Sequence, residues 1–237
     1  MSASDPSSPR KLIVGLTGGI GCGKSTLLQH LRSFGCACCD DDAIVHSLYS
    51  PGGAAVEPLR RLFGEGELPL ETSGALSRAK LSALIQSAAN PGEALRGVEA
   101  VVHPLVFQAK KAFIDSASSW LVILDTPLLL EGLHAQGVER GPGYLDAIIL
   151  VACATEVQRR RCLARPEMTE QKLELILQRQ MKAAERLAYA DFVVDTAPAG
   201  LDTVSSQVAG RSQAAGIVGQ LAARHGGPLQ LKAVPRT

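Results

Sequence analysis

The stretch "GGIGCGKST" at residues 18–26 constrains the fold more than any other part of the sequence. It follows a short apolar run, "KLIVGLT" at 11–17, and it precedes residues 24–34, whose leucines have helical spacing. The stretch contains the phosphate-loop pattern G-x-x-x-x-G-K-[ST]. In such a loop, glycines let successive backbone N–H groups converge on one anion at the start of a helix. The sequence therefore predicts a strand, a loop and a helix that together bind a nucleoside triphosphate.

The loop residues are expected to bind ATP, mostly through their backbone N–H groups. They are Gly18, Gly19, Ile20, Gly21, Cys22, Gly23, Lys24, Ser25 and Thr26. We expect Lys24 to act in catalysis by reaching the β- and γ-phosphates, and the Ser25 hydroxyl to bind Mg²⁺. Cys22 occupies a variable position of the pattern. The favoured interpretation is a small side chain, and the alternative is a redox-sensitive thiol near a helix N-terminus.

Further short apolar runs alternate with helical segments along the chain. They occupy residues 36–40, 120–125, 146–152 and 191–195. Strands that alternate with helices indicate a parallel sheet with helices on both faces. The predicted fold class is therefore α/β, a three-layer P-loop NTPase fold with a five-stranded parallel sheet.

Two stretches are too long to be simple crossovers between strands. Residues 43–115 contain three helical patterns and are interpreted as an inserted helical subdomain. Residues 155–188 contain a basic helix, a break at Pro166 and a second helix that Thr169 is expected to cap. The predicted organisation is a leader at 1–10, a domain at 11–224 with its core at 11–42, 116–154 and 189–224, and a tail at 225–237. The leader is expected to be disordered and the tail loose.

Composition and charge narrow the class of protein. The net charge of +1 argues against a nucleic-acid partner, and the sequence has no apolar run of the length needed to span a membrane. The six cysteines are expected to be reduced, because residues 1–10 do not resemble a secretory signal. We therefore expect a cytoplasmic protein that is a monomer or a weak oligomer.

Three cysteines and three aspartates lie together in "CACCDDD" at 36–42. The cysteines could be small buried residues of a strand, two ligands of a zinc site, or a redox C-x-x-C pair. The first interpretation is favoured, because a zinc site needs further ligands at suitable spacing and a redox pair is usually found at a helix N-terminus.

The aspartates follow the second predicted strand, and ligands of open α/β sheets bind beyond the carboxyl ends of the strands. If the extended conformation persists, Asp40 and Asp42 share a side, while Asp41 points away and caps the next helix. One carboxylate of the first pair could then accept a proton from an attacking hydroxyl, and the other could hold Mg²⁺ through water.

Five motifs together resemble the dephospho-coenzyme A kinase family. They are "LTGGIGCGKST", "CCDDDAIVH", "VVHPLV", "DTPLLLEG" and "ERLAYADFVVD", and their order and spacing match across residues 11–196. The resemblance implies transfer of the γ-phosphoryl group of ATP to the ribose 3′-hydroxyl of dephospho-CoA, with Mg²⁺ as cofactor. This reaction is the last step of coenzyme A synthesis.

The resemblance also implies that residues 43–115 form a helical CoA-binding subdomain and that residues 155–188 form a mobile lid. It implies roles for single residues as well. Asp42 is the expected general base, Asp40 a supporting or Mg²⁺-linked acid, and Asp125 a Walker-B-type acid. Arg161 and Arg165 are expected to be catalytic arginines of the lid. Arg186 is expected to bind ATP. The remaining substrate-binding residues, besides Asp40 and Asp42, are expected to be Arg78, His103, Pro127 and Glu131.

Some matched residues have other interpretations, and two positions depart from the family. His103 could be no more than a helix-boundary residue before Pro104, and Arg159 is interpreted as a solvated residue on the lid helix. The family often has Asn where this chain has Thr196, and a small residue where it has Asp41.

Other functions remain open from the sequence. One alternative is another small-molecule P-loop kinase, acting on a nucleoside monophosphate or on an acceptor such as shikimate or gluconate. A second is a non-catalytic nucleotide-binding regulatory protein. A regulatory GTPase would need an Asn-Lys-x-Asp guanine motif, which the sequence does not contain.

Overall fold

The computed structural model describes residues 10–64, 68–135, 137, 144–197 and 203–225. The chain forms two compact units. The first comprises residues 1–38 and 117–237, and the second is Cys39–Ser116. For comparison, the sequence predicted a helical insertion at 43–115. The two units are described separately below.

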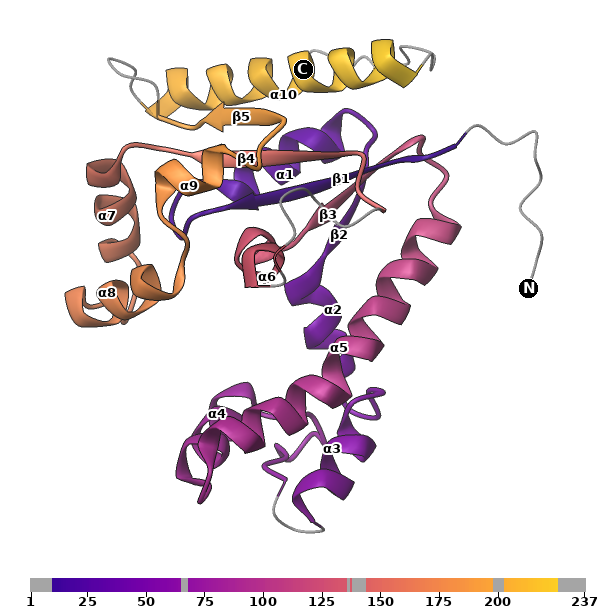
Figure 1. Cartoon of the computed structure of the whole chain (residues 1–237), viewed down its shortest axis with the longest axis vertical. Coiled ribbons are helices and arrows are strands. Elements are labelled where there is room, and N and C mark those ends of the chain that lie inside the picture. The colour runs from indigo at the N-terminus through magenta and orange to yellow at the C-terminus, as the bar shows by residue number, and fades with distance from the viewer. Residues whose placement is uncertain (1–9, 65–67, 136, 138–143, 198–202, 226–237) are drawn as a thin grey trace. The chain divides into compact units, whose positions relative to one another are not determined.

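The sheet has five strands in the order β2-β3-β1-β4-β5 (Figure 1). Their bounds are β1 Leu12–Gly18, β2 Ala37–Asp40, β3 Leu121–Asp125, β4 Ala147–Ala152 and β5 Phe192–Asp195. The central strand β1 pairs in parallel with both neighbours, so that Val14 lies opposite Ile123 on one side and Ala147 on the other. All five predicted strands and the α/β fold class are confirmed.

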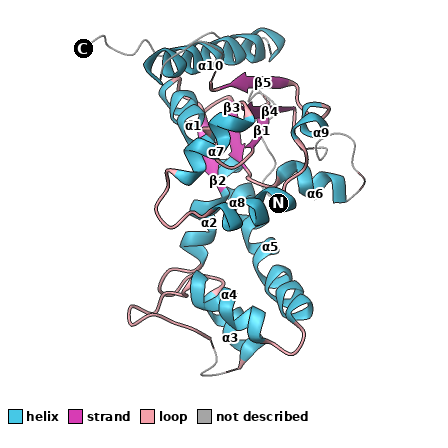
Figure 2. Ribbon diagram, turned by 90° about the vertical axis from the view of Figure 1, so that its left-hand side faces the viewer, coloured by secondary structure: helices cyan, strands magenta, loops and turns pink. Residues whose placement is uncertain are grey.

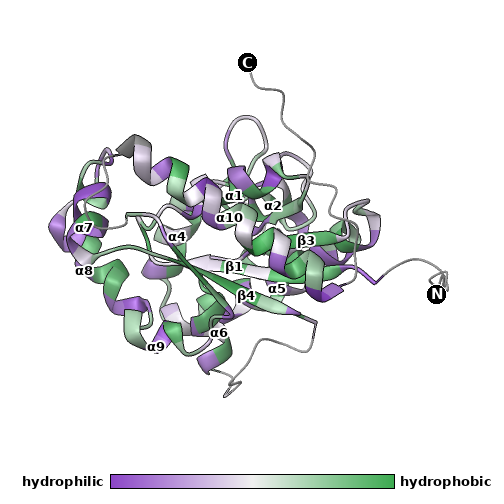
Figure 3. Cartoon of the chain, turned by 90° about the horizontal axis from the view of Figure 1, so that it is seen from above, coloured by the Kyte–Doolittle hydropathy of each residue, from purple (hydrophilic) through white to green (hydrophobic). Residues whose placement is uncertain are grey.

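The period-two pattern of β4 explains why helices cover both faces of the sheet. Ile149 and Val151 pack with α1 (Lys24–Ser33) and α10 (Thr203–His225) in one buried cluster. Ile148 and Leu150 point the other way, into a second cluster with α6 (Leu129–Ala135). Strand β4 is apolar along its length, as its green colour in Figure 3 shows. A strand buried on both faces needs this continuous apolar run, and the result is a three-layer fold.

The expected break at Pro166 separates α7 (Thr155–Leu163) from α8 (Glu170–Arg179). Thr169 caps α8 as predicted, because its hydroxyl accepts a hydrogen bond of 3.2 Å from the backbone N–H of Lys172. Arg159 lies on an exposed part of α7, as interpreted, and it also has partners on the next helix. Its guanidinium forms ion pairs with Glu170 and Glu174, and these pairs join α7 to α8. The short helix α9 (Ala183–Leu187) follows and leads into β5.

The second unit contains helices α2 (Asp41–Leu48), α3 (Val56–Phe63), α4 (Arg78–Ser87) and α5 (Pro91–Ser116), coloured cyan in Figure 2. These helices enclose their own apolar core. Its members include Leu48, Leu59, Leu81, Val98 and Val102. The unit thus buries its apolar residues against each other, as a compact subdomain does.

His103 and Pro104 lie inside α5, which continues to Ser116. The interpretation of His103 as a helix-boundary residue was therefore wrong. Pro104 lacks the N–H that would bond to the carbonyl group four residues earlier, but the apolar residues on both sides of it keep the helix packed on the core of the second unit.

The predicted leader and tail lie outside the described residues, except for Arg10 and His225. His225 ends α10, where its ring stacks on Trp120 with the ring centroids 6.0 Å apart. None of the helices in the described ranges has both the length and the apolar character needed to cross a membrane.

Candidate active site

The phosphate loop connects β1 to α1 as the sequence predicted. Gly21 and Gly23 adopt φ values of 73° and 91°, a left-handed conformation that strains other residues. Gly23 is the N-cap of α1 and has no side chain to occupy the start of the helix. The positive end of the helix dipole is therefore left for an anion.

Three polar side chains hold this loop from outside. The Gln158 amide donates a hydrogen bond of 2.8 Å to the carbonyl oxygen of Ile20, and Gln180 accepts one of 3.2 Å from the N–H of the same residue. The Thr196 hydroxyl donates to the carbonyl oxygen of Cys22 at 2.6 Å. Sequence analysis missed both glutamines, since a single glutamine, whether within a helix as Gln158 or after one as Gln180, carries no signal. Their role depends on where α7 and α8 fold.

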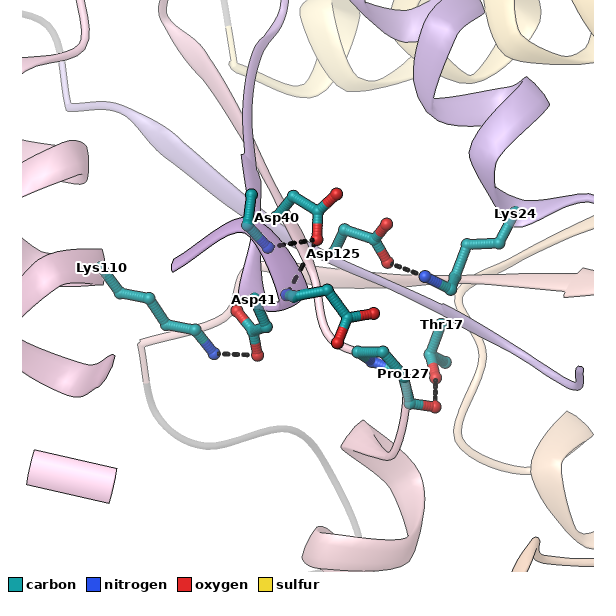
Figure 4. Close-up of polar contacts among 9 residues, drawn as sticks. Thr17, Lys24, Asp40, Asp41, Lys110, Asp125 and Pro127 are labelled. Carbon is teal, nitrogen blue, oxygen red and sulfur yellow. Dashed lines mark hydrogen bonds and ion pairs between the residues drawn. The ribbon is translucent and has the colours of Figure 1, made fainter. Parts of the chain in front are cut away.

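Lys24 and Asp125 form a buried ion pair in the first unit (Figure 4). Lys24 is the first residue of α1, and Asp125 ends β3, the strand that neighbours β1. The exposed fraction of the Asp125 side chain is 4%, so its charge depends on a close cation. Ser25 and Thr26, the next two residues of α1, are exposed. Asp125 therefore holds the lysine that the sequence predicts to bind phosphate.

The loop after β3 carries two of the predicted substrate-binding residues. The carbonyl oxygen of Pro127 accepts a hydrogen bond of 3.3 Å from the buried Thr17 hydroxyl. The Glu131 carboxylate accepts one of 2.9 Å from the N–H of Met181, the residue that follows Gln180. Both residues thus have structural partners within the first unit.

The three arginines matched to the family have different surroundings. Arg161 donates to the hydroxyl and the carbonyl oxygen of Thr196, at 2.8 and 3.0 Å. Arg165 follows the end of α7 and is exposed. Arg186 borders the phosphate loop, because a Cβ placed on Gly19 would lie 2.7 Å from its Nη1 atom. Its Nε–H is buried and has no hydrogen-bond partner among the described residues.

In the second unit, Asp40 replaces Asp41 as the cap of the next helix. One oxygen of the Asp40 carboxylate accepts from the N–H of Asp42 at 2.9 Å and from that of Ala43 at 3.3 Å (Figure 4). The prediction that Asp41 caps the helix was wrong, because the extended backbone ends at Asp40 and Asp41 is already helical. The period-two argument that placed Asp40 and Asp42 on one side fails for the same reason.

Asp41 instead forms an ion pair of 2.7 Å with Lys110 of α5, and both side chains are mostly buried. The pair connects α2 to α5. It also neutralises the negative charge of Asp41, which stands at a position where the family often has a small residue. Figure 4 shows Asp41 and Lys110 directed toward each other. Asp41 therefore has a structural partner within its own unit.

Asp42 and Arg78, both predicted site residues, are brought together in the second unit. The Arg78 guanidinium donates a hydrogen bond of 2.9 Å to the carbonyl oxygen of Asp42, and it lies 3.9 Å from the Asp42 carboxylate. It also lies 5.9 Å from the ring centroid of Tyr49. The Asp42 side chain is 73% exposed, so it can reach solvent or a substrate. His103 is exposed as well.

Of the three cysteines before the aspartates, Cys38 and Cys39 lie in β2, and Cys36 directly precedes it. Cys36 and Cys39 are buried, and burial raises the pKa of their thiols, to about 12 for Cys36 and about 11 for Cys39. Thiols with such values stay protonated and are poor metal ligands and nucleophiles. Within the described ranges, no group of three or more His, Cys, Asp or Glu side chains could hold a metal ion.

We predict that Thr196→Val raises the KM for ATP several-fold and lowers the melting temperature by about 4–8 °C. The change removes the hydrogen bonds of the hydroxyl to Cys22 and Arg161, each contributing about 1 kcal/mol, and leaves a carbonyl oxygen of the loop without its donor. Steady-state kinetics and thermal unfolding measure the two effects. Thr196→Ser keeps the hydroxyl and serves as the control. A Val variant that behaves like the Ser variant would contradict this role.

A family model and the relatives named below, all described as dephospho-CoA kinase, match this chain. A family model described as dephospho-CoA kinase matches residues 12–199. The chain is 42% identical to the dephospho-CoA kinase of Ruegeria pomeroyi over 183 residues, which is 77% of this chain and 86% of the relative. It is 39% identical to the dephospho-CoA kinase of Agrobacterium fabrum, over 83% of this chain and 94% of the relative.

Solved structures share the fold. The crystal structure of TT1252 from Thermus thermophilus has a TM-score of 0.68 at 29% identity, covering 90% of this chain and 98% of that one. The dephospho-CoA kinase from Campylobacter jejuni has a TM-score of 0.56 at 18% identity, with 89% and 97% coverage.

Proposed function

Because this chain belongs to the dephospho-CoA kinase family, we propose that it transfers the γ-phosphoryl group of ATP to the ribose 3′-hydroxyl of dephospho-CoA, with Asp42 as general base. The products are CoA and ADP. The observation that carries the proposal is the phosphate loop, held by Gln158, Gln180 and Thr196, with Lys24 at its end. Neither alternative, another small-molecule kinase or a regulatory protein, has a comparable match.

Phosphoryl transfer needs positioning and neutralisation of charge more than covalent chemistry. The loop N–H groups and the α1 N-terminus would hold the phosphates, and Lys24 would neutralise charge on the transferred group. Asp125 supports this role, because the buried carboxylate fixes the lysine at the start of α1. Arg186 would add positive charge beside the loop, because its Nη1 atom borders Gly19.

On the acceptor side, Asp42 would take the proton of the attacking 3′-hydroxyl. The Asp42 carboxylate is exposed and can therefore meet the hydroxyl, and the Arg78 guanidinium lies 3.9 Å from it. Arg78 and the exposed His103 would bind the acceptor, and the second unit would provide the surface for dephospho-CoA. Pro127 and Glu131 would shape the loop after β3, since both bond to neighbours rather than to solvent.

The segment α7–α8 would act as the lid, with Arg161 and Arg165 facing the phosphates when it closes. Arg161 is held by Thr196 in this structure, so closure would exchange these two hydrogen bonds for charge-assisted bonds to phosphate. A closed lid excludes water, which would otherwise hydrolyse ATP.

The residues present suit Mg²⁺, which prefers hard oxygen ligands. Ser25 exposes a hydroxyl at the start of α1, and Asp40 offers a carboxylate that would act through water. When bound, Mg²⁺ offsets the negative charge of the phosphates.

We expect ADP formation with dephospho-CoA to exceed that with AMP, adenosine, shikimate or gluconate by at least about 100-fold in kcat/KM, because contacts to the non-reacting part of a matching substrate also accelerate the reaction. A coupled ADP assay, run with Mg²⁺ and with EDTA, measures this ratio and the metal requirement. Equal turnover of another acceptor would contradict the substrate assignment. Binding of ATP without any turnover would favour the regulatory alternative.

A further inference from the structure

A pair of thiols lies directly behind the phosphate loop. The Sγ atom of Cys22, inside the loop, lies 3.5 Å from the Sγ atom of Cys153, which follows β4. Both residues belong to the first unit. Cys153 is partly exposed, whereas Cys22 is buried with an exposed fraction of 4%. The proposed phosphoryl transfer uses neither thiol.

We propose that Cys22 and Cys153 form a reversible disulfide that distorts the phosphate loop and lowers its affinity for ATP. A disulfide has an S–S length of about 2.05 Å. The two sulfur atoms therefore have to approach by about 1.5 Å, a shift of the size that rotation about one side-chain bond and a small loop movement provide. The backbone of Cys22 is part of the surface that would bind phosphate, so this movement changes the ATP site itself.

The charges around the pair favour a thiolate at Cys22. The hydrogen bond from the Cys153 thiol lowers the pKa of Cys22 to about 7; burial acts against this shift, and the charge of Arg186 adds to it. Cys162 of α7 also faces Cys22, and it raises the pKa slightly as a further thiol. The pKa of Cys153 is raised, first by its hydrogen bond to Cys22 and then by burial, so that Cys153 keeps the shared proton. Arg161 and Asp195 lie near Cys153 and act in opposite directions on its pKa.

The oxidant we consider is a peroxide, a small uncharged molecule. The Cys22 thiolate attacks one oxygen of hydrogen peroxide, the O–O bond breaks, and the departing hydroxide takes a proton from solvent to form water. Cys22 is then a sulfenic acid. The Cys153 sulfur attacks Cys22 Sγ, the S–O bond breaks, and the Cys153 proton leaves with the hydroxide as a second water. Two thiols lose two electrons and two protons in total, and one peroxide becomes two waters.

Trypsin places Cys22, Cys153 and Cys162 in three different peptides, so that mass analysis can identify which thiols are joined. Cleavage after lysine and arginine places Cys22 in residues 12–24, Cys153 in residues 141–159 and Cys162 in residues 162–172, whereas the strand cysteines fall together in residues 33–60. The proposal predicts a cross-linked peptide of 12–24 with 141–159 after treatment of the full chain with hydrogen peroxide. The peptide should disappear on reduction with dithiothreitol.

The catalytic activity should fall as the cross-link forms and recover when it is reduced. We expect peroxide to lower kcat/KM for ATP at least about tenfold, dithiothreitol to restore it, and saturating ATP to slow the loss by holding the loop. Cys153→Ser should keep the basal activity and resist peroxide, while Cys38→Ser, which changes a β2 cysteine away from the loop, should remain as sensitive as the parent. The rate of inactivation should rise about tenfold between pH 6 and pH 8 and stay nearly constant above pH 8. The reason is that a thiol with a pKa of about 7 is almost fully deprotonated at pH 8.

Two results would overturn the proposal. One is a cross-link of 12–24 to 162–172, which would assign the partner to Cys162. The other is equal loss of activity in Cys153→Ser, which would show damage elsewhere. Because mass analysis of the peptides does not depend on turnover, it would reveal the disulfide even if the proposed substrate assignment failed.

Discussion

Replacing Asp42 with asparagine is expected to lower kcat about 10²–10⁴-fold while the KM for ATP changes less than about threefold. The amide keeps the shape of the side chain but cannot accept the proton of the attacking hydroxyl, and general-base catalysis contributes about this much. The fold should be unaffected, because the side chain is 73% exposed and its carboxylate lies 3.9 Å from Arg78. Single-turnover and steady-state kinetics, with ATP binding by calorimetry, separate the chemical step from binding.

Asp41→Asn provides the matched control on the neighbouring carboxylate. That change breaks the ion pair with Lys110 and should lower the melting temperature while kcat stays within about threefold of the parent. If Asp41→Asn loses as much kcat as Asp42→Asn, the loss comes from disturbing α2, and Asp42 is not the base.

Replacing Lys24 with methionine is expected to lower kcat/KM for ATP about 10³-fold, because one positioned cation is removed from the transferred phosphoryl group. A second effect follows from the structure. Asp125 loses its ion pair in a buried position, which should lower the free energy of unfolding by about 3 kcal/mol. Chemical denaturation measures the stability, and coupled ADP release measures the activity.

The double variant Lys24→Met/Asp125→Asn separates these two effects. Removing the buried charge should recover most of the lost stability without restoring activity. Activity that returned with stability would show that Lys24 serves only to compensate Asp125. It would leave the lysine without a role at the phosphates.

The sequence predicted those features that depend on neighbouring residues. The glycines at positions 21 and 23 predicted the left-handed backbone of the phosphate loop, and the apolar run "DAIILVA" predicted a strand buried on both faces. The cap at Thr169 was also predicted correctly, because a hydroxyl before a helical pattern bonds to an N–H three residues later. Each of these features follows from local backbone geometry, and hence from a few adjacent residues.

The wrong prediction about the aspartates concerns the boundary between a strand and a helix. Whether Asp40 or Asp41 caps α2 depends on the single residue at which the backbone turns from extended to helical. A shift of one position exchanged the roles of the two carboxylates and gave Asp41 a partner on α5, far away in the sequence. The partners of Arg159 were missed for a related reason, since the two glutamates lie on the next helix.

The sequence by itself determined the phosphate loop, the strand pattern and, through its motifs, the family. The tertiary structure alone decided which side chains meet. Thr196 donates a hydrogen bond to Cys22, Gln158 donates one to Ile20, and the Cys153 thiol donates one to the Cys22 sulfur. Each pair is separated by more than a hundred residues in the sequence. Backbone conformation follows from local sterics, whereas a hydrogen bond or a thiol pair between distant residues requires the packing of whole helices and strands. For this reason the groups that hold the loop, and the pair that could switch it, became visible only in the folded chain.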